Sequence, residues 1–161
     1  MGEQSPTKNN NKSLMKLPEI TLNISYSNKV KKSELKLIQS SADCVDILRP
    51  LFDNSIDWRE EMVMLCLNRA NKVIAYYRVS VGGTTSTIVD PKIIFSVALN
   101  CLCSAIVLCH NHPSGNLKPS EADNSITNKI KEAGKLLDIT LLDHIIITDD
   151  SYYSYAEEGK I

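Results

Sequence analysis

Two spacings of apolar residues alternate along the chain and predict strands and helices in turn. Positions that are apolar without a break, or at every second residue, predict strands in five segments: residues 20–26, 62–67, 73–81, 104–109 and 139–148. The last segment is long enough for one strand or for a strand pair. A turn around Asn68 and Asn71 joins the second segment to the third.

Apolar residues three and four positions apart predict three helices, over residues 41–52, 93–102 and 120–137. Asp90 and Pro91 suit the entry to the second helix, because aspartate is a good N-cap and proline is tolerated at the first helical position. The third helix has one apolar face, and Gly134 falls within its last turn.

This alternation of strands and helices favours the α/β class, with a mixed sheet that carries helices on both faces. The 161 residues leave room for one domain with an ordinary core, which we expect at residues 18–161. Residues 1–17 are polar and rich in Asn, Lys and Ser, and they predict a disordered tail.

Composition and charge narrow the classes of protein further. With 18 basic and 19 acidic residues, the total charge gives no electrostatic grip on nucleic acid. Any such binding should be weak and carried by the tail, which contains Lys8, Lys12 and Lys16. The tail lacks the apolar segment of a secretory signal, and no run is long enough to span a membrane. The five cysteines, an odd number set mostly in apolar patterns, suit a reducing compartment. We therefore expect a cytoplasmic protein without membrane contact.

Residue types that bind metals gather after the fourth strand segment. His110 and His112 are two positions apart at the predicted strand end, so both side chains leave it on the same side. Asp123 follows eleven residues after His112, behind a turn rich in Pro, Gly and Asn that can bring the chain back. Three N and O ligands with a fourth position left for water are typical of a catalytic zinc centre.

Some of these residues also have a simpler structural explanation. The run from Ser120 to Asp123 fits a capping box that opens a helix, which taken alone is the commoner reason for the pattern. The two roles are compatible, since a carboxylate in the first helical turn keeps lone pairs for a metal. His144 lies inside an apolar run, which favours a buried, hydrogen-bonded histidine over a ligand, while a supporting role for Asp143 stays open.

The pattern His-x-His, seven residues, Ser-x-x-Asp, with a glutamate far upstream, resembles the JAMM (MPN-plus) metalloprotease motif. Over residues 43–148 the chain looks like the bacterial RadC branch of that superfamily. The motifs that carry this resemblance are Arg59-Glu60, Val89-Asp90-Pro91, His110-Asn111-His112-Pro113-Ser114-Gly115, Pro119-Ser120, Glu132-Ala133-Gly134 and Leu141-Leu142-Asp143-His144. The fold implied is a three-layer, cytidine-deaminase-like (JAB/MPN) α/β fold.

The resemblance also implies a role for individual residues. The implied zinc ligands are His110, His112 and Asp123. Ser120 would help to bind the oxyanion, and Glu60 would be the general acid/base. The family pattern selects Glu60 because its catalytic glutamate directly follows an arginine. The local charges do not distinguish Glu60 from Glu61, and both suit a solvated entrance to a strand.

The function implied is a zinc-dependent hydrolase of peptide or isopeptide bonds that acts on a protein or peptide through a metal-activated water. The alternative is a DNA-repair-associated accessory protein that binds nucleic acid or a protein partner. Longer RadC proteins carry a helix-hairpin-helix-like region before this domain, and we expect this chain to lack it, which favours the hydrolase. Base deamination is disfavoured, because the chain has His-Asn-His and no Pro-Cys pair where deaminases have H-x-E and P-C-x-x-C.

Overall fold

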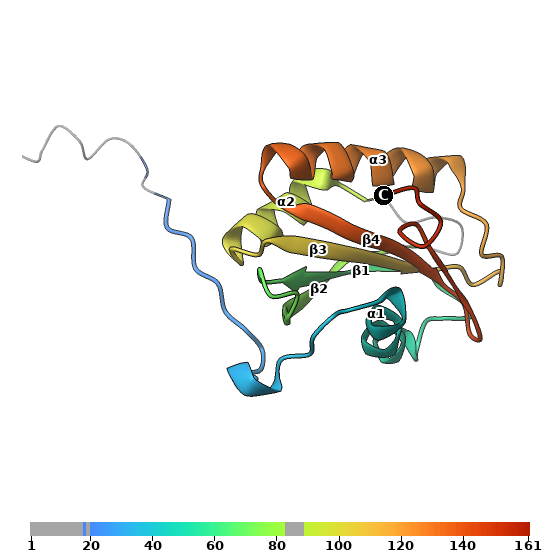
Figure 1. The fold of residues 1–161 in the computed structure, drawn as a ribbon, viewed down its shortest axis with the longest axis horizontal. Coiled ribbons are helices and arrows are strands. Elements are labelled where there is room, and N and C mark those ends of the chain that lie inside the picture. Colours follow the sequence, from blue (N-terminus) through green and yellow to red (C-terminus); the bar gives the residue numbers. More distant parts are fainter. Residues whose placement is uncertain (1–17, 19, 83–88) are drawn as a thin grey trace, which may run out of the picture.

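A five-stranded sheet forms the centre of the fold (Figure 1). The structure is a computed structural model that describes residues 18, 20–82 and 89–161, so the tail expected at residues 1–17 lies outside it. The strands are β1 (Glu61–Leu67), β2 (Val73–Val81), β3 (Ala105–Asn111), β4 (Thr140–Ile147) and β5 (Tyr152–Ser154). Their order is β2-β1-β3-β4-β5, and β3 pairs parallel with β4 while the other pairs are antiparallel. The sheet is mixed, as predicted.

Helices cover both faces of the sheet (Figure 1). Helix α1 (Ser41–Leu48) lies against one face, while α2 (Pro91–Asn100) and α3 (Glu121–Leu136) lie against the other. Successive side chains of the strands point to opposite faces of the sheet and pack into two separate apolar cores, one under α1 and one under α2 and α3. Val107 and Leu108, neighbours on β3, belong to different cores. This arrangement confirms the predicted three-layer α/β fold.

Helix α3 follows its predicted limits closely because its sequence determines both ends. Ser120 Oγ accepts from the backbone N–H of Asp123, and the Asp123 carboxylate accepts from the backbone N–H of Ser120, which completes the predicted capping box. At the other end, a Cβ on Gly134 would lie 2.3 Å from the carbonyl oxygen of Ile139. Only glycine therefore lets the chain turn back this tightly into β4.

The largest differences between prediction and structure concern two elements, while α2 and β3 are shifted by one or two residues and the short strand β5 was not predicted. The helix expected over residues 41–52 ends at Leu48 and continues as a 3-10 helix, Arg49–Phe52, since Pro50 cannot donate the backbone hydrogen bond of an α-helix. The strand expected at residues 20–26 is wrong: this segment lies outside the sheet (Figure 1), with Ile20 83% exposed. Alternation alone does not form a strand without a partner for its backbone groups.

The described part of the chain contains no helix that is both long enough and apolar enough to cross a membrane. All five cysteines are free thiols, and four of them are buried: Cys44, Cys66, Cys103 and Cys109. Cys109 packs in the core under α1, on the opposite strand face from His110, as the alternation of side chains predicts.

Candidate metal centre

The end of β3 brings the two predicted histidines together. His110 and His112 lie on the same side of the chain, and their Nε2 atoms are 3.0 Å apart. The backbone N–H of His112 donates to the carbonyl oxygen of Ile147, which keeps this residue aligned with the neighbouring strand β4. His110 is almost completely buried, whereas the His112 side chain is 16% exposed. The site therefore opens to solvent on the side of His112.

The first turn of α3 adds the predicted aspartate to this pair. Asp123 Oδ1 lies 3.2 Å from His110 Nε2, and Asp123 Oδ2 lies 3.7 Å from His112 Nε2. Ligands bound tetrahedrally to one zinc ion at 2.0–2.2 Å are about 3.3 Å apart. The separations between His110, His112 and Asp123 match this spacing, so the three side chains fit a shared ion.

Hydrogen bonds prepare the lone pairs that a metal requires. His112 Nδ1 lies 2.6 Å from the carbonyl oxygen of Asn116. A carbonyl only accepts, so Nδ1 carries the hydrogen and Nε2 keeps its lone pair towards Asp123. Without a cation, this lone pair and the Asp123 carboxylate would face each other as two acceptors. The arrangement is the usual one for a metal-ligating histidine whose second nitrogen is held by a backbone carbonyl.

The pKa values at this point show that the site attracts positive charge. Burial by itself would raise the pKa of Asp123, but the imidazoles of His110 and His112, which donate to the carboxylate when they are protonated, outweigh burial and hold the pKa well below its usual range. The hydrogen bond that the protonated ring of His112 can donate to Asp123 raises the pKa of His112 above its ordinary value. Asp123 is therefore an anion at neutral pH, and it favours either a proton or a metal ion on the neighbouring nitrogens.

Glu60 reaches the same centre from the residue before β1. One of its carboxylate oxygens and one nitrogen from each of His110 and His112 all lie within 4.8 Å of one another. These three residues form a candidate metal-binding group, and Asp123 contacts the same two imidazoles. A carboxylate at this separation can ligate an ion or contact a water beside it. The structure thus brings together Glu60 and all three predicted ligands, while their individual roles stay predictions.

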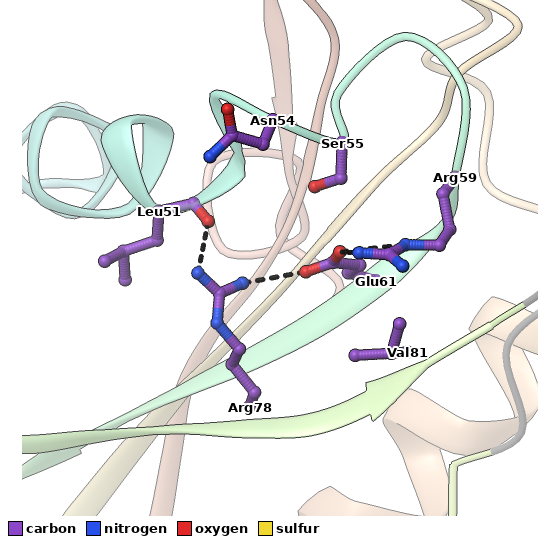
Figure 2. Close-up of a pocket in the computed structure, with 7 residues that line it drawn as sticks. All are labelled: Leu51, Asn54, Ser55, Arg59, Glu61, Arg78 and Val81. Atoms are coloured by element: carbon purple, nitrogen blue, oxygen red, sulfur yellow. Dashed lines mark hydrogen bonds and ion pairs between the residues drawn. The ribbon is translucent and has the colours of Figure 1, made fainter.

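The neighbouring Glu61 faces a different environment, since successive strand residues point to opposite faces. Figure 2 shows its carboxylate between Arg59 and Arg78. These side chains line a pocket of about 200 Å³. Arg78 donates to Glu61 Oε2 at 2.7 Å and to the carbonyl oxygen of Leu51. Glu61 is only 3% exposed, so the expectation of a solvated strand entrance is wrong for this residue. Arg59, two positions away, and Arg78, on β2, interact with the Glu61 carboxylate in place of the water that burial removes.

Glu61→Gln is therefore expected to weaken the fold, because the amide would turn an NH2 group towards one of the two arginines. We expect a loss of roughly 1–3 kcal/mol, less than the roughly 3–5 kcal/mol of fully buried pairs, since Arg59 and Arg78 keep partial solvent contact. Chemical denaturation measures it. Glu132→Gln is the matched control, because Glu132 pairs with Lys135 on the exposed surface and should change stability by less than about 0.5 kcal/mol. Equal effects of the two variants would contradict this account.

Ser120 contacts the candidate ligand Asp123 directly. Its hydroxyl donates to Asp123 Oδ2 at 2.7 Å and accepts from the Asp123 backbone N–H at 3.1 Å. Both bonds orient the carboxylate and close the first turn of α3. The oxyanion role of Ser120 stays a prediction, and in this arrangement its hydroxyl hydrogen is directed at Asp123.

Asn111, between the two histidines, is a supporting residue that sequence reasoning missed. Its Oδ1 accepts from the backbone N–H of Glu61, and its Nδ2 donates to the carbonyl oxygens of Ser55, Ile56 and Arg59. Asn111 is completely buried. It therefore fixes the backbone on both sides of Glu60 against the strand that carries His110 and His112. The partners lie 50 or more positions away, so the local sequence contains no signal for this role.

The structure separates the two residues at the centre of β4. His144 is fully buried, and burial lowers its pKa well below the ordinary value. It contacts the His110 ring, so the prediction of a buried, hydrogen-bonded histidine is confirmed. Asp143 instead accepts from the hydroxyls of Ser41 and Ser154, which ties α1 and β5 to the sheet. The hydrogen bonds of the Asp143 side chain therefore connect elements of the fold and do not support the candidate metal ligands.

A three-layer α/β domain with a histidine pair at a strand end and carboxylates from two other elements defines a candidate metal-binding domain. The profile of the RadC-like JAB domain family matches residues 38–160, and the chain belongs to this family. A UPF0758 protein of Flavobacterium johnsoniae is 47% identical over 126 residues, which cover 78% of this chain and 54% of the relative. A UPF0758 protein of Chlorobium chlorochromatii is 32% identical over 143 residues, 89% of this chain and 62% of the relative. The chain thus spans about half to three fifths of the length of these curated relatives.

Proposed function

We propose that this domain is a zinc-dependent hydrolase of amide bonds, of the peptide or isopeptide kind. The convergence of two imidazole nitrogens with the Asp123 carboxylate, next to Glu60, is the observation that carries the proposal. Two nitrogens and one carboxylate oxygen are a ligand set found in catalytic zinc sites, which leave one position open. The partial exposure of the His112 and Asp123 side chains supports the proposal, because it leaves this side of the centre open to solvent.

In this proposal, different residues around the centre bind the metal, transfer the proton and hold the backbone in position. Zinc, when bound, supplies positive charge that lowers the pKa of water and polarises a carbonyl group. His110, His112 and Asp123 would hold the ion, and the hydrogen bonds from Ser120 and to Asn116 keep two of these side chains in position. Glu60, whose carboxylate lies beside the two imidazoles, would accept a proton from the attacking water and return it to the leaving amine. Asn111 holds the backbone beside Glu60 in the register that this transfer needs.

A cleavage assay with and without chelator tests the proposal. The purified protein should be loaded with one equivalent of zinc and incubated with peptide libraries and with lysine isopeptide conjugates. We expect products that disappear after metal removal and return when zinc is restored. A DNA panel at physiological salt, with single-stranded and forked oligonucleotides, measures the competing accessory function. Salt-dependent DNA binding without any chelator-sensitive cleavage would contradict the hydrolase and favour that alternative.

A further inference from the structure

Two buried polar side chains, His144 and Thr127, connect the His110 ring to the first turn of α3. His110 Nδ1 lies 2.9 Å from His144 Nε2, and His144 Nδ1 lies 2.5 Å from Thr127 Oγ1. Thr127 Oγ1 in turn donates to the backbone carbonyl oxygen of Asp123 at 2.6 Å. His144 and Thr127 are at most 1% exposed. The chain of contacts therefore begins and ends at two candidate metal ligands, and it runs through the protein interior.

The hydrogens along this chain have only one consistent arrangement when His144 is neutral. The Asp123 carbonyl only accepts, so the single hydroxyl hydrogen of Thr127 points to it. Thr127 Oγ1 must then accept from His144 Nδ1–H. A neutral imidazole has one N–H, which leaves His144 Nε2 as an acceptor for His110 Nδ1–H. His110 Nε2 consequently keeps its lone pair, directed at Asp123 and His112.

The packing of His144 supports this neutral, fixed ring. Its ring is fully buried and stacks on Tyr155, with centroids 5.1 Å apart and an angle of 9° between the planes. The Tyr155 hydroxyl donates to Asn124 Oδ1 at 2.9 Å, which holds the stacking partner against α3. Because the ring is enclosed in this way, its two nitrogens have Thr127 and His110 as their hydrogen-bond partners.

We propose that Thr127 and His144 are positioning residues that set the tautomer of His110 and so make its Nε2 a metal ligand. His112 reaches the same state by a separate route, through the backbone carbonyl of Asn116. The side-chain route, unlike the backbone route, can be reversed by a substitution that removes none of the candidate metal ligands. This inference rests on the metal centre of the proposed function, but it does not depend on which bond is cleaved.

Thr127→Val tests the relay, with Thr127→Ser as the matched control. Valine has nearly the same shape but no acceptor for His144 Nδ1–H, so His144 gains by moving its hydrogen to Nε2 and pointing it at His110. His110 would then carry its hydrogen on Nε2, against the metal. We expect zinc affinity, measured by chelator competition, to fall about 10- to 100-fold in Thr127→Val and to stay within about 3-fold in Thr127→Ser.

Nitrogen-15 NMR of the histidine rings in the metal-free protein gives a second, independent result. The wild type should show His110 with its hydrogen on Nδ1, and Thr127→Val should shift the population towards Nε2. An Nε2–H tautomer of His110 in the wild type, or wild-type zinc affinity in a folded Thr127→Val protein, would overturn the inference. If Thr127→Val does not fold, the wild-type tautomer alone decides. Failure to find any cleavage would count against the hydrolase and leave these two measurements valid.

Discussion

Replacing His110 and His112 together with alanine is expected to remove zinc from the protein, from about one ion per chain to almost none. The two imidazoles supply the nitrogens that converge 3.0 Å apart, and without them the candidate ligands left at this centre, within the part of the chain that the structure describes, are the carboxylates of Asp123 and Glu60. Carboxylates alone form a poor zinc site, because structural and catalytic zinc centres depend on imidazole or thiolate ligands. Elemental analysis of the purified protein and titration of the metal-free protein with zinc measure the loss.

The control for this prediction is Cys101→Ser with Cys103→Ser, which should retain the full zinc content. Cys103 is buried in the core under α2, and its thiol contacts the carbonyl oxygen of Ala98. It lies before the start of β3, whereas the histidines lie at the end of this strand, so its thiol cannot share their ion. Near-stoichiometric zinc in the double histidine variant would show that the metal binds elsewhere. Loss of zinc in the cysteine variant would have the same meaning, and either result would remove the basis of the proposed hydrolase.

The parts of this site that the sequence predicts well are those that local geometry determines. Two histidines at the end of a strand must point the same way, because side chains alternate with a period of two. Ser120 and Asp123 are three positions apart in a pattern that begins a helix, and they do cap α3. Both the common direction of the two histidines and the cap of α3 can be predicted without information on which strands are neighbours in the sheet. The mixed sheet with helices on both faces follows in the same way from the alternation of strands and helices along the chain, whereas the three-layer fold was implied by the family resemblance.

The parts that the sequence does not predict depend on contacts between distant segments. Glu60 and Glu61 are equivalent locally, and only the pairing of β1 between β2 and β3 sends Glu61 towards Arg78. The role of Asn111 depends on the pairing of β1 with β3, since its partners lie just before β1 and at the first residue of β1. His144 is recognisable as buried, but its contact with His110 requires the parallel register of β3 and β4. Conversely, the strand expected at residues 20–26 failed because no segment pairs with it among the described residues.

Glu60→Gln is expected to abolish turnover while zinc and the fold are retained. Glutamine keeps the shape of the side chain, but its amide cannot accept a proton from water at neutral pH. General acid/base groups of this kind contribute about 10²- to 10⁴-fold to rates, so kcat should fall by at least about 100-fold. Zinc content and the denaturation midpoint should stay close to the wild-type values, because the two histidines and Asp123 remain in place.

Glu61→Gln discriminates between the two neighbouring glutamates in the same assay. This variant should lower the free energy of unfolding, because the amide cannot form the ion pairs with Arg59 and Arg78. It should keep most of the turnover when kcat is measured well below the unfolding temperature. We therefore expect opposite outcomes for the two variants. Glu60→Gln should lower kcat and leave the stability unchanged, whereas Glu61→Gln should lower the stability and leave kcat nearly unchanged. If the Glu61 variant loses turnover while the Glu60 variant keeps it, the assignment of the proton-transfer role to Glu60 is wrong. A Glu60 variant that loses its zinc would instead make this carboxylate a ligand, because its oxygen lies within 4.8 Å of both histidine nitrogens.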